Sequence, residues 1–319
     1  MRQYATALDG VKAAASNIGA ERTRPGSFNA LAVLYYRSPE FRNLKASTQK
    51  SRRRTIEGFR REHGDKPLKH LGRQHIKAII CAKAATPESA NTLLKVLRLM
   101  LAVAVDVGMI EQNPAAGIKR FKSRGEGFHT WSEDEIARFE VQHPIGSKAR
   151  LAFTLLLYTA QRRSDVMRMG WQHVRNDQIS VRQAKTDKVL LIPMHPELTR
   201  VLGAVPKHNL TFLLTDRGAP FSSTGFGAWF RRQCDEAGLP ECSAHGLRKA
   251  AATRLANAGC STEQIKAITG HKSLSEVARY TAAADQERLA RKAIDLQIGA
   301  EREQALSSRS TRLDKAECN

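Results

Sequence analysis

The chain has 319 residues, of which 41% are hydrophobic, so it can form two domains with apolar cores and is not a disordered chain. Its formal net charge of +21 indicates a polyanionic partner, first of all nucleic acid. No apolar run reaches the roughly 18 residues of a membrane span, and the N-terminus lacks a signal-peptide core. We therefore expect a cytoplasmic protein with no membrane partner.

The basic charge is unevenly distributed along the chain. Residues 1–120 contain 22 Lys and Arg against 9 Asp and Glu, a net charge of +13, whereas the remainder carries +8. The first part is therefore expected to be the main contact for DNA phosphates. The five cysteines are scattered without a CxxC pair, which predicts neither a zinc site nor a disulfide framework.

The first 118 residues are predicted to contain a lead segment and a helical domain. Residues 1–26 form the lead segment, which ends at a turn-like Arg-Pro-Gly, and residues 27–118 have apolar residues at helical spacing. One helix is expected to open at Thr86 and to stop at Gly108. Within the helical domain, a basic stretch predicts contacts with the DNA backbone, although a solvated face is the alternative. Its arginines are Arg52, Arg53, Arg54, Arg60 and Arg61.

A basic, glycine-containing linker at 119–130 is predicted to lead into a second domain at 131–299. Ser132 and Glu135 have the spacing of a capping box before a helix. Residues 178–181 and 189–192 predict a strand pair around a polar loop at 184–188. Helical patterns fill the remainder, and the tail at 300–319 is predicted to be disordered.

Four short motifs in this second domain carry residues suited to phosphate chemistry, and each is weak alone. Residues 159–165 (TAQRRSD) end an apolar helix with arginines, and residues 185–186 place a lysine in the strand-pair loop. Residues 245–248 (HGLR) form an HxxR motif, but residues 70–73 form a second copy, to which we assign no catalytic role. The fourth motif is Gly-His-Lys at 270–272.

The order of these motifs is more specific than any one of them. His245 and Arg248 lie one helical turn apart, His271 follows Arg248 by 23 residues, and Tyr280 follows His271 by 9. The order Arg, Lys, HxxR, Gly-His, Tyr resembles the catalytic signature of tyrosine recombinases of the phage integrase type. The resemblance extends from about 27 to 295 and is strongest over 130–285. The candidate catalytic residues are Arg162, Lys185, His245, Arg248, His271 and Tyr280.

The resemblance implies a mainly α fold with a small β-sheet. A helical N-terminal core-binding domain would precede a mixed α/β catalytic domain of the tyrosine-recombinase type. One departure from the family is Ala160, where a glycine is usual. If this position requires a positive φ, alanine is less favourable there, but a helix end can accept it.

The implied reaction cuts and rejoins DNA through a 3′-phosphotyrosine at Tyr280. Arg162 and Arg248 can donate paired hydrogen bonds to the scissile phosphate, and His271 is expected to add a further donor. His245 is the candidate base for the tyrosine, and Lys185 is the candidate acid for the leaving 5′-oxygen. Because the ester keeps the bond energy, we expect no cofactor and no metal.

Several alternatives remain at this stage. The favoured function is integration or excision of a phage or mobile element, by a homotetramer on two paired sites of double-stranded DNA, with accessory DNA-bending proteins, near a bacterial nucleoid. A type IB topoisomerase would share the catalytic residues, and a non-catalytic DNA-binding regulator is a third reading. A helix at 284–298 with Leu289, Ala293 and Leu296 on one face is expected to dock on a neighbouring subunit or on its own domain.

Overall fold

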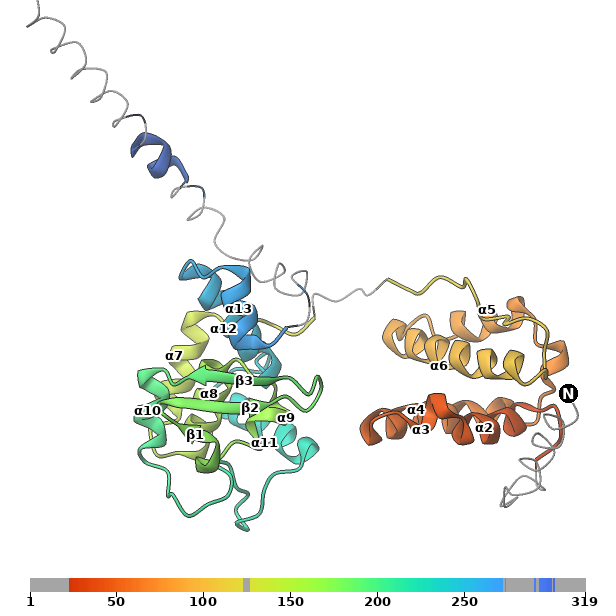
Figure 1. The fold of residues 1–319 in the computed structure, drawn as a ribbon, viewed down its shortest axis with the longest axis horizontal. Helices are drawn as coiled ribbons and strands as arrows, with labels where there is room; N and C mark the ends of the chain where they lie inside the picture. The colour runs from red at the N-terminus through yellow and green to blue at the C-terminus, as the bar shows by residue number, and fades with distance from the viewer. Residues whose placement is uncertain are drawn as a thin grey trace, which may run out of the picture. The chain divides into compact units, whose positions relative to one another are not determined.

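The computed structural model describes residues 23–122, 127–271, 273, 290, 293–299 and 301. The chain divides into two compact units, Met1–Gly125 (unit 1) and Glu126–Asn319 (unit 2) (Figure 1). The expected fold class, mainly helical with a small sheet, is confirmed. Within the described ranges no helix is both long and apolar enough to cross a membrane. Most of the predicted lead segment, and the tail beyond 301, lie outside the described residues.

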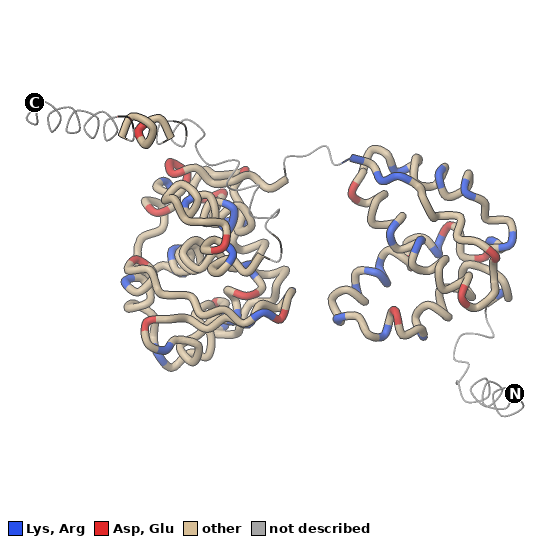
Figure 2. Tube along the Cα trace, turned by 45° about the horizontal axis from the view of Figure 1, so that its top comes forward, with Lys and Arg blue, Asp and Glu red and all other residues tan. Residues whose placement is uncertain are grey.

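Unit 1 consists of helices that enclose one apolar core. Its elements are α2 (Phe28–Arg37), α3 (Pro39–Arg42), α4 (Ala46–His63), the short 3₁₀ helix η1 (Leu68–His70), α5 (Arg73–Cys81) and α6 (Pro87–Asp106). The expected start of α6 is confirmed, with Thr86 as N-cap and Pro87 as first residue, and Gly108 follows its end at a φ of +71°. Basic residues line the helices of this unit in Figure 2.

Unit 2 combines helices with a three-stranded sheet. Its elements are α7 (Glu133–Gln142), α8 (Lys148–Thr159), α9 (Arg163–Val166), η2 (Trp171–His173), β1 (Val174–Arg175), β2 (Gln178–Arg182), β3 (Val189–Pro193), α10 (Pro196–Leu202), α11 (Ser223–Glu236), α12 (Ala244–Asn257) and α13 (Thr262–Thr269). The Ser132 capping box at the start of α7 is confirmed. The helical pattern after α8 gives only the four-residue α9, which ends at Val166.

The helix α8 lies at the centre of unit 2. Ten of its twelve residues are buried, which explains why its sequence is apolar all round rather than striped. An aromatic cluster covers one end of this core. Phe139 stacks on Phe153 with ring centroids 4.9 Å apart, and it lies 5.4 Å from Trp131 and 5.7 Å from Phe230.

The three strands form an antiparallel sheet in the order β1-β2-β3 (Figure 1). The predicted pair is confirmed as β2 and β3, with Ile179 opposite Ile192 and Val181 opposite Leu190. These four side chains are buried and belong to the same core as α8 and α12, whereas Leu191 faces outward and is 65% exposed. The two-residue strand β1 was not expected from the sequence.

The C-terminal helix is described only in part. Residues 293–299 are helical, and within them Ile294, Leu296 and Ile298 are 54%, 67% and 40% exposed. Leu289, and with it the first half of the helix expected at 284–298, lies outside the described residues.

Replacing Phe139 by alanine should destabilise unit 2 by about 3–5 kcal/mol, because it empties the centre of the aromatic cluster. All three tryptophans of the chain belong to unit 2, so urea unfolding followed by tryptophan fluorescence reports on this unit. Val141→Ala is the control on the same helix, because Val141 is 86% exposed and should change stability by less than about 0.5 kcal/mol. Equal unfolding midpoints for the two variants would contradict this placement of the core.

Candidate active site

The turn after α8 has the left-handed backbone conformation, with the positive φ at Ala160 that the sequence analysis considered. Ala160 has a φ of +52° and is 1% exposed, and the chain then enters α9 with Arg162 as its N-cap. An L-residue in this conformation costs roughly 1–2 kcal/mol. The turn directs the Ala160 carbonyl toward α12, where it accepts a hydrogen bond from Arg248 Nη1 at 2.5 Å. Alanine is therefore tolerated at this helix end, and its backbone carbonyl helps to hold the Arg248 side chain in place.

Arg248 is the largest of the fully buried side chains, with 1% exposure. It lies on α12 one turn after His245, and Ser243 caps that helix by accepting from the Gly246 N–H. Its Nη2 donates to His271 Nε2 at 3.0 Å. A buried cation is stable only when its donors have partners, and Ala160 and His271 supply two of them.

The hydrogen bonds around His271 define its tautomer. Thr269 Oγ1 lies 2.7 Å from Ile265 O, to which it donates its only proton, so it can only accept from His271 Nδ1, also at 2.7 Å. Arg248 can only donate, so Nε2 of His271 must accept. The neutral imidazole with its proton on Nδ1 satisfies both contacts.

Arg162, His245 and Arg248 line one hollow of about 420 Å³. No carboxylate is among its described lining residues, and Arg163 and Arg231 add two further guanidiniums to its wall. Nη1 of Arg162 is buried without a hydrogen-bond partner in the described part of the chain. Buried donors of positive charge without an acidic partner are suited to an anionic ligand with several oxygens, such as a phosphate.

His245 lines this hollow from an exposed position, and the Phe128 ring lies tilted against its imidazole at 4.7 Å between ring centroids. Loss of water around the ring lowers its pKa below the ordinary value of 6.5, and the positive charges of Arg248, Lys249, Arg162 and Lys185 lower it further. The imidazole is therefore neutral at pH 7 and able to accept a proton.

Lys185 lies on the exposed tip of the β2–β3 hairpin. The hairpin is attached to α9, because the Ala184 N–H donates to Asp165 Oδ1 at 2.8 Å. The structure thus brings together Arg162, His245, Arg248 and His271 directly, with Lys185 close enough to influence His245 electrostatically. Tyr280 lies outside the described residues.

The matching family is the one described as "Phage integrase family", whose model covers residues 133–287. The chain contains a phage integrase family domain in unit 2. It is 25% identical over 248 residues to the integrase of Escherichia phage HK022, covering 70% of this chain and 67% of that protein. Its fold is similar to a lambda integrase dimer bound to a COC′ core site (TM-score 0.72, 22% identity, 80% of this chain and 95% of that one). A lambda integrase tetramer bound to a Holliday junction is also similar (TM-score 0.71, 22% identity, 85% and 81%). All six candidate catalytic residues fall within the region that matches the family.

Four polar residues that lie within or next to the sequence motifs also contribute to the site, although we assigned them no role from the sequence. Asp165 anchors the Lys185 hairpin, Thr269 orients His271, and two glutamines, Gln161 and Gln183, lie beneath the site with 0% exposure. Their position next to the charged residues of the motifs was the signal available in the sequence. The residues that they contact come from other segments of the chain, so these contacts cannot be predicted from the local sequence.

One side-chain cluster could hold a cation. His129, Glu135 and Cys242 bring ligand atoms within 4.8 Å of one another. Glu135 already accepts from the Ser132 N–H at 2.7 Å and from His129 at 2.8 Å, so a helix cap and an ion pair explain the cluster. Burial also raises the pKa of the Cys242 thiol far above its usual range, which opposes a metal-binding thiolate.

The five arginines of α4 in unit 1 fall into two groups. Arg52 donates to the Tyr35 hydroxyl at 2.5 Å, Arg60 donates to Asn29 Oδ1 and Glu57, and Arg53 stacks on Tyr36 at 4.3 Å. Arg54 and Arg61 are exposed and have no hydrogen bond or ion pair with any residue that the structure describes. They lie two turns apart on one helix face.

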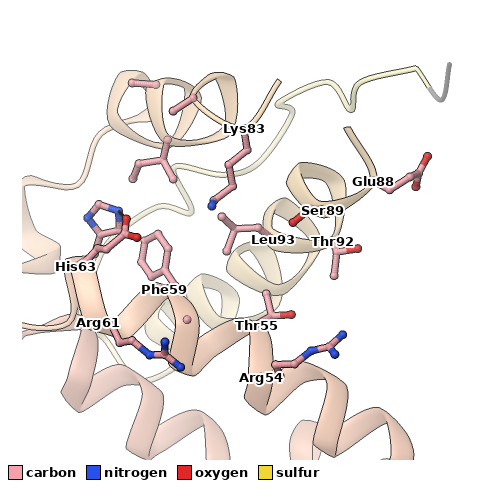
Figure 3. A pocket seen from close by; sticks show the side chains of 15 residues that line it. Arg54, Thr55, Phe59, Arg61, His63, Lys83, Glu88, Ser89, Thr92 and Leu93 are labelled. Atoms are coloured by element: carbon pink, nitrogen blue, oxygen red, sulfur yellow. Dashed lines mark ion pairs between the residues drawn. The ribbon is translucent and has the colours of Figure 1, made fainter. Parts of the chain in front are cut away.

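Arg54 and Arg61 border a hollow of about 1010 Å³ between α4, α5 and α6 (Figure 3). Lys83, just after α5, lines the same hollow, whose floor includes Phe59 and Leu93. Glu62 and Glu88 also line it, so the cations are partly balanced. This face of α4 presents the arginines that remain available to a polyanion.

We expect an NMR titration of His245 to give a pKa below 6.5, and Lys249→Gln to raise it, because one nearby positive charge is removed. Glutamine can keep the hydrogen bond that Lys249 donates to the Phe128 carbonyl. Because the folded-state pKa is the lower one, the contribution of His245 to stability is fully present above pH 6.5 and is lost as the pH falls from that value through the folded-state pKa. Lys266→Gln, a half-buried lysine of α13 that pairs with Glu263, is the control and should leave the His245 titration unchanged. A normal or raised His245 pKa would contradict the described electrostatics.

Proposed function

We propose that this chain is a site-specific DNA recombinase whose scissile phosphate binds in the hollow between Arg162, His245 and Arg248. The observation that carries this proposal is a hollow without carboxylates among its described lining residues, lined by the buried Arg248 and the half-buried Arg162, within the region that matches the integrase family. We further propose integration or excision of a phage or mobile element as its biological role, as in the HK022 integrase that it resembles.

The two guanidiniums serve the transition state more than the ground state. As a nucleophile adds to phosphorus, negative charge grows on the non-bridging oxygens, and donors that are already oriented stabilise it without reorganisation. Arg248 is held in one orientation by Ala160 and His271 at the wall of the hollow where the phosphate would bind. Arg162, at the N-cap of α9, lines the same hollow and has a buried Nη1 without a partner among the described residues.

The covalent step needs a base and an acid. The Tyr280 oxygen forms a bond to phosphorus, its phenolic proton passes to His245, and the bond from phosphorus to the 5′-oxygen breaks. The electron pair stays on the 5′-oxygen, which takes a proton from Lys185. His245 is neutral at pH 7 because its pKa is lowered, so it can accept the proton. Rejoining reverses each transfer.

His271 orients Arg248 in this arrangement. Its Nε2 accepts from Arg248, so a direct donor role of Nε2 toward the phosphate requires an added proton on the ring. Thr269 fixes the ring through Nδ1 at 2.7 Å, which keeps Nε2 facing the guanidinium. We therefore assign His271 first to the orientation of Arg248.

We propose that unit 1 is a core-binding domain at 27–118 and that unit 2 contains the catalytic domain at 131–299. The proposed contacts with the DNA backbone are Arg54, Arg61 and Lys83. Arg52, Arg53 and Arg60 instead contact side chains of unit 1 and hold α4 in place. A homotetramer on two paired DNA sites is the proposed assembly, as for the similar lambda integrase tetramer on a Holliday junction. The exposed Ile294, Leu296 and Ile298 suit a helix that docks on a neighbouring subunit. Accessory DNA-bending proteins and a place on the bacterial nucleoid complete the proposal.

Arg162→Ala and Arg248→Ala should each slow cleavage by about 10²–10³-fold, because each removes an oriented donor to the transition state. The substrate is a labelled nicked duplex that carries a DNA site selected by binding to the protein. Affinity for this DNA should change little. Arg163→Ala is the control, because its exposed guanidinium lines the same hollow but is not assigned to the phosphate. Full cleavage by either of the first two variants would overturn the site.

The double variant Arg54→Gln, Arg61→Gln should reduce the dependence of log K on log salt by about 0.9 for each lost phosphate contact. The matched control is Arg52→Gln, Arg60→Gln, which removes the same charge from the same helix. It should lose thermal stability, through its contacts to Tyr35 and Asn29, and keep the salt slope. Binding assays over a salt series measure both slopes. An equal reduction in the control would mean that the two arginine groups do not differ in DNA contact.

A further inference from the structure

A pair of buried glutamine side chains lies directly beneath the candidate active site. Gln161 precedes Arg162 on the turn after α8, and Gln183 follows β2 two residues before Lys185. Both are 0% exposed. We propose that this amide pair is a positioning device for DNA cleavage, which holds the segments of Arg162, Lys185 and His271 in one arrangement.

The two amides are connected to four other residues. Gln183 Nε2 donates to Gln161 Oε1 at 2.7 Å and to Thr269 O at 2.9 Å. Gln161 Nε2 donates to Thr159 O at 2.9 Å and to Ile268 O at 2.8 Å. Thr186 Oγ1 donates to Gln183 Oε1 at 2.6 Å. Every amide hydrogen of the pair is therefore used, and each amide oxygen accepts at least one bond.

This pattern permits only one orientation of each amide. If the Gln183 amide were reversed, its nitrogen would face the Thr186 hydroxyl and its oxygen would face two other oxygens. A fully satisfied buried network of this kind is rigid and specifies one geometry, whereas loss of one member leaves several buried groups unpaired.

The network joins segments that are far apart in the sequence. Thr159 and Gln161 belong to the turn that presents Arg162, Gln183 and Thr186 flank Lys185, and Ile268 and Thr269 end the helix before His271. Gly270 packs against the pair at a φ of +69°, and a Cβ there would lie 2.5 Å from Gln183 Nε2. The close approach of the His271 segment therefore depends on glycine as well as on the amides.

This inference rests on the proposed function, because it assigns the pair a role in placing Lys185 and the phosphate-binding residues. Gln183 has the most direct effect on Lys185, since its side chain fixes Thr186 within the hairpin loop. Without this contact the loop keeps the hydrogen bond from the Ala184 N–H to Asp165, but Thr186 is no longer tied to the amide pair. Lys185 would then be less well aligned with the leaving 5′-oxygen.

The first test compares Gln183→Met with Gln178→Met, an exposed residue on the same strand, β2. With the nicked substrate, Gln183→Met should cleave about 10²-fold more slowly, the size of loss expected when catalytic groups are displaced by about 1 Å. Its affinity for DNA should stay within about twofold, since the pair has no contact with solvent. Gln178→Met should cleave at the wild-type rate. Normal cleavage by Gln183→Met would overturn the inference.

A sulfur substrate separates positioning from general loss of structure. When sulfur replaces the bridging 5′-oxygen, the thiolate leaves without needing a proton, so the reaction no longer depends on Lys185 as an acid. We expect the defects of Lys185→Ala and of Gln183→Met both to shrink at least about tenfold on this substrate, whereas the defect of Arg248→Ala should persist. An equal defect of Gln183→Met on both substrates would overturn the role of the pair in placing Lys185. An unrescued Lys185→Ala would instead refute the proposed acid, and with it the role of the pair in placing that acid.

Thr186 provides a milder variant in case Gln183→Met does not fold. Thr186→Val removes the hydroxyl that donates to Gln183, at a partly exposed position, and Thr186→Ser keeps it. We expect slower cleavage for the valine variant, with the same rescue by the sulfur substrate, and nearly normal cleavage for the serine variant. Equal rates for both variants would overturn the proposal.

Discussion

The burial of one cation, Arg248, determines how this active site is built. A guanidinium with 1% exposure needs acceptors, and the protein supplies them from two distant segments. The Ala160 carbonyl is available only because the chain turns left-handed after α8, and His271 is available only because its ring is fixed by Thr269. The left-handed turn at Ala160 and the ordering of the His271 ring each cost free energy. The hydrogen bonds that both groups make with the buried Arg248 guanidinium offset these costs. The hollow that results is lined by several guanidiniums and by no described carboxylate, which suits a phosphodiester.

Uncharged polar groups beneath the site also fix its geometry. Catalytic donors must be held within fractions of an ångström, and the charged residues themselves have long, flexible side chains. The structure therefore holds their backbones in place: the Gln161–Gln183 pair for three segments, and Asp165 for the Lys185 hairpin. Such buried polar groups add little to net stability but fix one arrangement among several.

Sequence alone predicted the features that depend on neighbouring residues. The Ser132 cap, the β2–β3 pair and the HxxR spacing are local patterns, and the structure has each of them. The strand β1 has only two residues and leaves no periodicity to detect. The amide pair joins positions 22 residues apart and could not be inferred without the fold. For α4, helical spacing already places Arg54 with Arg61 and Arg53 with Arg60. Only the structure, however, shows which of these two faces is occupied by protein contacts.

The most direct test of the account is to locate the covalent bond between protein and DNA. Wild-type protein is trapped on a nicked duplex that carries its selected site, digested with trypsin and nuclease, and examined by tandem mass spectrometry. The account predicts a nucleotide attached through phosphate to Tyr280, on the peptide of residues 280–288, and no adduct in Tyr280→Phe despite normal DNA binding. An adduct on another residue, or one that survives in Tyr280→Phe, would contradict the assignment of the nucleophile and the mechanism built on it.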